Sequence, residues 1–117
     1  YHYMPEVSAL ASSDSMHALQ IAKYDVPVTT LDEFFAGRDD SRTVCAMKIA
    51  VEGFETRVLR GGARFFARTK PYVAIDIHDD PFGTGTTEAG VRGCLEPIGY
   101  RFEKMKHVLA CYPPDAT

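Results

Sequence analysis

The stretch that decides the fold is VCAMKIAVEGFETRVLRGGARFFARTKPYVAIDI, residues 44–77. Its first eight residues, 44–51, are apolar except for Lys48, a pattern typical of a strand buried on both faces of a parallel sheet. Apolar residues then recur at helical spacing over 52–68, where the pair Gly61-Gly62 is expected to break or kink the helix. A second apolar run, YVAIDI, closes the stretch and predicts another buried strand.

The flanking segments extend this pattern in both directions. Alternating apolar residues over 19–28 predict one or two edge strands, and Thr30 followed by Glu33 predicts the capped start of a short helix. A further helix is expected from about 91 to 96, followed by a strand pair at 100–112. We therefore expect an α/β fold, with a mainly parallel sheet and an antiparallel closing strand pair.

Composition limits the class of protein. The chain has 117 residues, 45% of them hydrophobic, which suits one domain with one core. Its net charge of −3 argues against a nucleic-acid partner, and no apolar run approaches the ~20 residues needed to span a membrane. Three widely spaced cysteines predict buried thiols rather than disulfides or a zinc site, and with no leader pattern we expect a cytoplasmic location.

Polar residues follow or interrupt the two predicted buried strands near their carboxyl ends, where open parallel sheets bind ligands. Glu52 and Glu55 lie three residues apart at a predicted helix start. One interpretation makes them a general base or an acceptor for a ligand hydroxyl; the other is that first-turn carboxylates simply stabilise the helix. Lys48 needs a partner or a route to solvent. The partner would be Asp76 or one of the glutamates in an ion pair, and the functional alternative is a catalytic lysine.

The second strand ends in Asp76 and His78, which point to the same face of a regular strand. With Asp79 and Asp80 they could form an acid/base pair or a divalent-metal site. The alternative is a strand-end histidine followed by a solvated acidic loop. No second cluster with ligand spacing occurs, so we predict no metal site, and the glycine-rich run 83–87 is expected to be a flexible loop.

Three ordered segments resemble the FkbM-type family of S-adenosylmethionine-dependent methyltransferases. They are VPVTTLDEFF at 26–35, KIAVEGFETRVLRGGARFF at 48–66 and KPYVAIDIH at 70–78, and SALASSD at 8–14 is similar to the piece before them. The resemblance covers roughly residues 7–112.

The resemblance implies a Rossmann-like class I methyltransferase fold and S-adenosylmethionine as cofactor. It also implies transfer of a methyl group to an oxygen, with a sugar, glycolipid or polyketide-type hydroxyl as the small-molecule or glycan acceptor. Carried over by position, Glu52, Glu55 and Lys48 are expected to act in catalysis. Asp76 and His78 are expected to bind the acceptor; no cofactor-binding residue is assigned.

Two departures from the family pattern shape what we expect of the chain. Ala50 stands where the family has an aspartate, and both the glycine-rich cofactor turn and the acid that holds the ribose are missing. A complete domain needs on the order of 200 residues, since each βαβ unit takes about 30. We therefore expect residues 1–117 to be the C-terminal part of such a domain, lacking the cofactor-binding half and binding S-adenosylmethionine weakly or not at all.

Two other functions stay open. A decayed methyltransferase half could serve as a non-catalytic binding or assembly module, which the alanine at position 50 favours. A metal-dependent hydrolase would use Asp76, His78 and Asp80. A partial sheet also leaves a strand edge unpaired, so we expect self-association through that edge.

Overall fold

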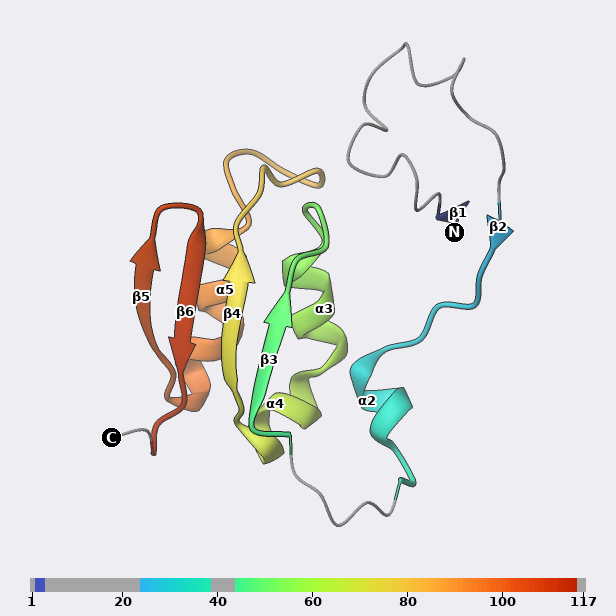
Figure 1. The fold of residues 1–117 in the computed structure, drawn as a ribbon, viewed down its shortest axis with the longest axis horizontal. Helices are drawn as coiled ribbons and strands as arrows, with labels where there is room; N and C mark the ends of the chain where they lie inside the picture. The colour runs from blue at the N-terminus through green and yellow to red at the C-terminus, as the bar shows by residue number, and fades with distance from the viewer. Residues whose placement is uncertain (1, 4–23, 39–43, 116–117) are drawn as a thin grey trace.

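A four-stranded sheet forms the centre of the molecule. The computed structural model describes residues 2–3, 24–38 and 44–115. The strand order is β3-β4-β6-β5, so β3 and β5 form the two edges (Figure 1). The strands are β3 (Ala46–Ile49), β4 (Tyr72–Asp76), β5 (Arg101–Met105) and β6 (Val108–Tyr112). Two short strands, β1 (His2–Tyr3) and β2 (Tyr24–Asp25), pair separately and antiparallel.

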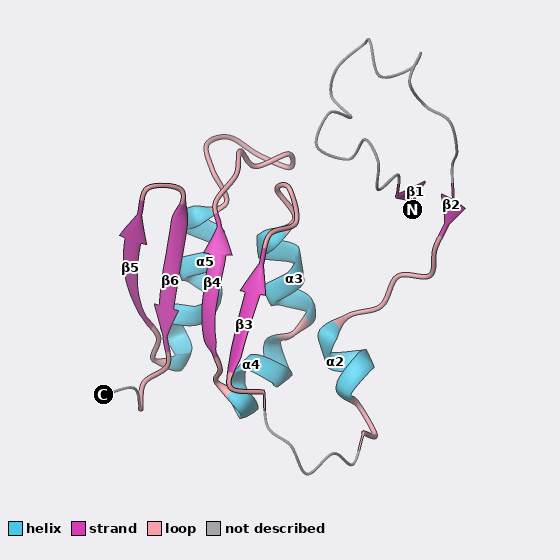
Figure 2. Cartoon of the chain, viewed as in Figure 1, coloured by secondary structure: helices cyan, strands magenta, loops and turns pink. Residues whose placement is uncertain are grey.

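The sheet is mixed rather than mainly parallel. β3 and β4 run parallel, with Lys48 opposite Ala74, while β4 pairs antiparallel with β6 and β6 with β5 (Figure 2). Because β6 inserts between β4 and β5, two of the three strand pairs are antiparallel. The expected α/β class and the antiparallel closing pair are confirmed, but the mainly parallel sheet is not. The strand expected around Leu19 and Ile21 lies outside the described residues.

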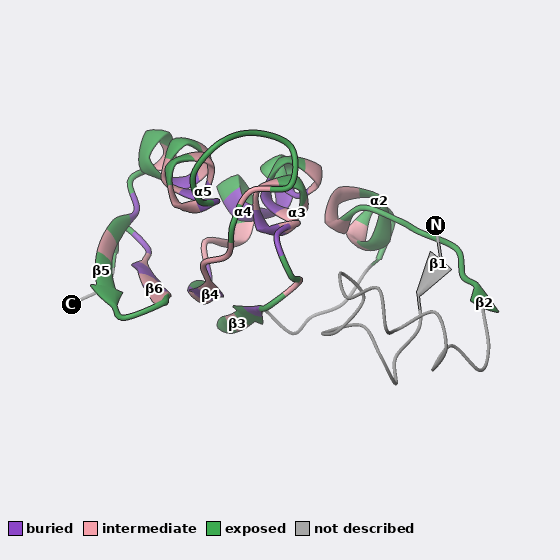
Figure 3. Cartoon of the chain, turned by 90° about the horizontal axis from the view of Figure 1, so that it is seen from above, coloured by how far each residue is buried: buried purple, intermediate pink, exposed green. Residues whose placement is uncertain are grey.

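The helices that cover the sheet lie on one of its faces, as the view from above shows (Figure 3). They are α3 (Glu55–Gly61), α4 (Ala63–Thr69) and α5 (Glu88–Leu95), which continues into the short 3₁₀ helix η2 (Glu96–Ile98). The helical stretch expected over 52–68 is thus broken at Gly62, as predicted. It begins later than expected, because Glu52 and Gly53 take left-handed backbone angles with φ of 52° and 100°.

The core lies between the sheet and these three helices. Leu59, Phe66, Val91 and Leu95 pack from the helices against buried strand residues. The strand residues are Ile49, Val73, Ile75, Leu109 and Cys111. Side chains on a strand alternate between faces, so their neighbours point away from the helices.

The face opposite the helices is open in the described part of the chain, which corrects the expectation that residues 44–51 are buried on both sides. Within β3 only Ile49 is fully buried, and Lys48 is exposed. No ion pair joins Lys48 to Asp76 or to the two glutamates among the described residues. A lysine is therefore tolerated in this apolar run because its side chain reaches solvent.

A short helix, α2 (Leu31–Phe35), begins as predicted: the Thr30 hydroxyl accepts a hydrogen bond from the Glu33 N–H at 3.0 Å. The carboxylate of Asp32 then accepts from the N–H groups of Arg64 and Phe65 at 3.2 and 2.8 Å. Since these groups open α4, Asp32 caps a helix about thirty residues further along the chain and fixes α2 against it. None of the helices in the described ranges is long and apolar enough to cross a membrane.

The contact between α3 and α5 makes the first testable prediction. A Cβ added at Gly90 would lie 2.4 Å from Oγ1 of Thr56 and 2.7 Å from its Cγ2, so the helices would have to move apart. We expect Gly90→Ala to lower the free energy of unfolding by about 1–3 kcal/mol, measured by urea denaturation.

Gly93 is the matched control, because it lies on the same helix with nothing within 4 Å of an added Cβ. Gly93→Ala is expected to raise stability by about 0.5–1 kcal/mol through the helix preference of alanine. Equal stability of the two variants would contradict the close packing of α5 on α3.

Candidate functional site

Two loops meet beyond the carboxyl ends of β3 and β4. They are the turn over 50–54, which leads into α3, and the loop over 77–87, which leads into α5 (Figure 1). A Cβ on Gly53 would lie 2.9 Å from Cδ of Pro81 and 3.1 Å from the carbonyl oxygen of Asp79. With its φ of 100°, this position needs glycine both for its conformation and for its contact. The two loops therefore touch through backbone.

The carboxylate of Glu55 links these two loops through hydrogen bonds to both. Its side chain is 0% exposed, and each oxygen accepts two hydrogen bonds. Oε2 accepts from the N–H groups of Val51 and Gly53 at 3.1 and 3.0 Å. Oε1 accepts from the hydroxyl of Thr87 at 3.0 Å and lies 3.1 Å from Nδ1 of His78. Glu55 is thus buried and fully hydrogen-bonded, as buried polar groups must be.

His78 lies between the two glutamates predicted from the sequence. Its Nδ1 faces Glu55, and its Nε2 lies 3.9 Å from Oε2 of Glu52, with the ring 28% exposed. Because Nδ1 faces a carboxylate, we assign the proton of the neutral ring to Nδ1. Nε2 then keeps its lone pair and faces the exposed Glu52.

The charges around His78 outweigh its burial. Desolvation alone would lower its pKa, but the hydrogen bond to Glu55 and the negative charges of Glu55, Glu52 and Asp76 raise the pKa above 6.5. The imidazolium form is therefore stabilised in the folded protein. An imidazole held in this way can accept a proton at Nε2, because the surrounding carboxylates stabilise the positive charge that results.

The sequence-predicted residues divide into two groups. Glu52, Glu55 and His78 come together, and Asp76 acts on His78 through its charge. Lys48 lies apart from them, exposed on β3. Glu55 touches no solvent, whereas Glu52 is 64% exposed, so of the two only Glu52 can reach a ligand directly.

The acidic run after His78 has a structural use. The carboxylate of Asp80 accepts the N–H of Phe82 at 2.8 Å, and the Asp80 N–H donates to the carbonyl of Gly85 at 2.9 Å. These bonds shape the loop. Among the residues that the structure describes, no group of three or more His, Cys, Asp or Glu side chains could hold a metal ion.

Sequence reasoning missed Thr87, because the glycine-rich run 83–87 predicts only a flexible loop. Thr87 is 1% exposed, and its hydroxyl donates to Glu55. Its position just before a helix would suggest only a cap. The contact with a residue 32 positions earlier has no signal in the local sequence.

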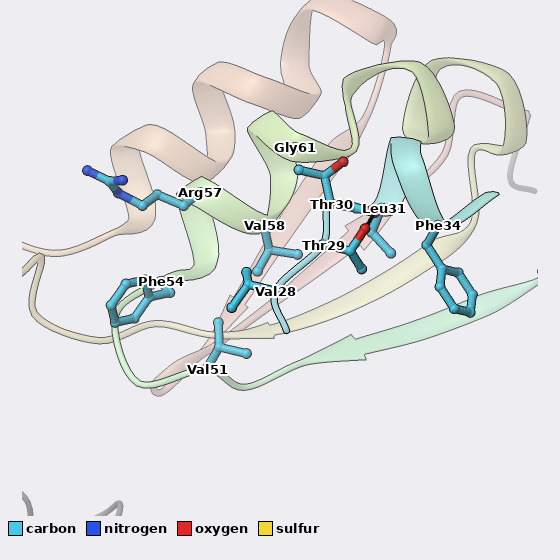
Figure 4. A pocket seen from close by; sticks show the side chains of 10 residues that line it. All are labelled: Val28, Thr29, Thr30, Leu31, Phe34, Val51, Phe54, Arg57, Val58 and Gly61. Atoms are coloured by element: carbon cyan, nitrogen blue, oxygen red, sulfur yellow. Dashed lines mark hydrogen bonds between the residues drawn. The ribbon is translucent and has the colours of Figure 1, made fainter. Parts of the chain in front are cut away.

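A groove of about 750 Å³ lies beside this site, between α3 and the segment that leads into α2 (Figure 4). Among its described lining residues Arg57 alone is charged, and its guanidinium lies 3.7 Å from the ring centroid of Phe82. Glu55 and His78 do not line it, but the groove and the site share the turn before α3. The lining residues are Val28, Thr29, Thr30, Leu31, Phe34, Val51, Phe54, Arg57, Val58 and Gly61.

The comparison with protein families gives one match. The model of the methyltransferase FkbM domain matches residues 5–102, most of the chain. The chain belongs to the FkbM methyltransferase family. The match includes the site residues of this FkbM domain and ends in β5, so β6 lies beyond it. No curated protein and no solved structure was found to match.

Methyltransferases of this kind use S-adenosylmethionine, whose ribose hydroxyls and amino acid part call for a carboxylate and a glycine-rich turn. In the described FkbM domain, the groove is lined by no carboxylate, and its one glycine, Gly61, belongs to α3. The described residues that line the smaller hollow along β3 likewise include no acidic one, and Ala50 is among them. The described residues by themselves do not fit the cofactor.

The hydrogen bonds of Glu55 make a stability prediction. In Glu55→Gln one carboxylate oxygen becomes an NH2 group, so this buried side chain can no longer accept all four of its hydrogen bonds. We expect the free energy of unfolding to fall by about 1–3 kcal/mol, measured by urea denaturation at pH 8. The matched control is Glu52→Gln, which is exposed and should change stability by less than about 0.5 kcal/mol. Equal midpoints for the two variants would show that Glu55 is not the buried link described here.

The raised pKa of His78 predicts a pH dependence. A folded-state pKa above 6.5 means that protonation adds stability, fully present below 6.5 and lost as the pH rises through the folded value. Between about pH 6 and pH 8, the wild-type chain should therefore lose stability relative to His78→Asn, which keeps a donor near Nδ1 but cannot titrate. If the free energy of unfolding changed with pH in the same way for both proteins over this range, the raised pKa of His78 would be refuted.

Proposed function

We propose that this chain acts in an S-adenosylmethionine-dependent methyltransferase that methylates a hydroxyl group, and that His78 accepts the hydroxyl proton. The observation that carries the proposal is the imidazole held by the buried Glu55 carboxylate where β3 and β4 end. Family membership supports methyl transfer in general. The acceptor and the roles of single residues are proposals.

The geometry of His78 suits a general base. With Nδ1–H donated to Glu55, Nε2 is free to accept a proton, and the partly exposed ring leaves room for an acceptor hydroxyl. The charge that develops on the ring is stabilised by Glu55, Glu52 and Asp76. In this proposal Glu55 is a positioning residue, since it is buried, and the exposed Glu52 contacts the acceptor.

Asp76 and Lys48, which were also expected at the site, do not accept the proton in this proposal. Asp76 supports the charge on His78 and lies at the last position of β4, where it can contact an acceptor. Lys48 was expected to act in catalysis. Since its side chain is exposed on β3 and does not join the group around His78, the proposal gives it no step in the proton transfer.

The groove supports an acceptor with an apolar body. Valines, a leucine and two phenylalanines dominate its lining as far as the structure describes it, and Arg57 at the Phe82 side is the one charged residue in that part. Such a surface favours a glycolipid or a polyketide-type molecule over a free sugar. The hydroxyl end of the acceptor would then reach His78 past the shared turn at Val51–Phe54.

When bound, S-adenosylmethionine supplies the methyl group. Since the described residues do not fit it, we propose that other residues hold the cofactor and that this chain alone binds it weakly or not at all. The contribution of the described residues is to position the acceptor, exclude water from the apolar groove and remove the proton.

A non-catalytic binding or assembly module is the second candidate. It is favoured by Ala50, which is exposed directly after β3, and by the open face of the sheet that includes Lys48. Association through the edge of β3 that no described strand pairs belongs to this candidate and remains a prediction.

The test is methyl transfer by the protein as its gene encodes it, using cofactor with a labelled methyl group and a free sugar, a glycolipid and a polyketide alcohol as acceptors. We expect label in the glycolipid or polyketide product, and a rate about 10²- to 10⁴-fold lower for His78→Asn. Glu96→Gln, a change at an exposed residue of η2, should keep the wild-type rate.

The outcomes separate the candidates. Methyl transfer at the wild-type rate by His78→Asn would show that His78 is not the general base. Transfer to none of the acceptors, together with no cofactor binding by calorimetry, would favour the non-catalytic module.

A further inference from the structure

Thr87 stands at a helix start but does not serve as a cap. It is the N-cap residue of α5, where a threonine hydroxyl ordinarily accepts a hydrogen bond from the first turn of the helix. Here its side chain makes no such bond. The hydroxyl of a residue that is 1% exposed is therefore available for another use.

The Thr87 hydroxyl contacts both Glu55 and His78. The Thr87 hydroxyl donates to Oε1 of Glu55 at 3.0 Å, and this is the oxygen that faces Nδ1 of His78. The same hydroxyl oxygen accepts the backbone N–H of His78 at 3.4 Å. The Thr87 backbone N–H donates to the His78 carbonyl at 2.9 Å. Thr87 thus holds both partners of the pair.

A carboxylate oxygen has two favoured directions for accepting hydrogen bonds. The Thr87 hydroxyl takes one direction at Oε1, and the other remains for the ring of His78. Oε2 is already bonded to two backbone N–H groups. Without the hydroxyl, Oε1 has a vacant direction and the His78 backbone loses a partner, so the ring is held less firmly to one orientation.

We propose that Thr87 is a positioning residue for His78: its hydroxyl fixes Oε1 of Glu55 and thereby holds the neutral ring with its proton on Nδ1. The inference rests on the proposed function only for the role of His78 as proton acceptor. Through Thr87, the start of α5 would then determine which nitrogen of the His78 ring faces the hydroxyl of the methyl acceptor.

The test compares Thr87→Ser with Thr87→Ala in the full chain. Both variants lose the methyl group, and only the serine keeps a hydroxyl. The ¹⁵N chemical shifts of the His78 ring, measured above its pKa, report which nitrogen carries the proton. We expect the Nδ1–H form to dominate in the wild type and in Thr87→Ser, and the Nε2–H form to rise several-fold in Thr87→Ala.

The control is Thr86→Ala, which removes the neighbouring exposed hydroxyl that bonds Glu88 and not Glu55. It should keep the wild-type tautomer. A folded Thr87→Ala with the wild-type tautomer would overturn the proposal. Thr87→Val, which keeps the volume without the hydroxyl, replaces the alanine variant if circular dichroism shows that the latter is unfolded.

A wild-type measurement covers the case in which neither variant without the hydroxyl folds. The Thr87 hydroxyl proton should exchange slowly with water and show a nuclear Overhauser effect to the His78 ring; its absence overturns the proposal. These readouts need neither cofactor nor acceptor. Absence of methyl transfer together with the expected tautomers would therefore reject the proposed function and leave the positioning by Thr87 intact.

Discussion

The buried carboxylate of Glu55 is the constraint on which this end of the molecule depends. Burying an ionised group is costly unless hydrogen bonds replace its water. Here these hydrogen bonds come from three segments: the turn before α3, the loop that follows β4 at His78, and the start of α5 at Thr87. The hydrogen bonds to the Glu55 carboxylate therefore fix the two loops and the starts of the helices that follow them. The same bonds orient the imidazole on which the proposed chemistry depends.

Features with local causes could be predicted from the sequence. The cap at Thr30 depends on a hydroxyl three residues before a free N–H, and the break at Gly62 on a pair of glycines. The apolar runs gave the positions of β3 and β4, and the family resemblance was confirmed over residues 5–102. The cap, the helix break and the apolar runs are each set within a few residues, so no tertiary contact was needed to recognise them.

The rest is set by contacts between distant residues, which spacing does not encode. Glu55 meets His78 and Thr87 across 23 and 32 positions, so its burial and the role of Thr87 were not foreseen. The insertion of β6 beside β4 made the sheet mixed, because strand order is decided by packing. For Lys48 the sequence leaves an ion pair and a route to solvent both open; no ion pair forms among the described residues, and the side chain reaches solvent on the face opposite the helices.

The most direct test of the link between Glu55 and His78 is the pKa of His78 itself, followed by the ring proton shifts in a nuclear magnetic resonance titration. The structure predicts a value above 6.5 in the wild-type chain, because hydrogen bonding and negative charge outweigh burial. It also predicts that the value falls in Glu55→Gln, where the buried charge is gone while the side chain keeps its shape. A wild-type pKa at or below 6.5, unchanged by that substitution, would contradict the account.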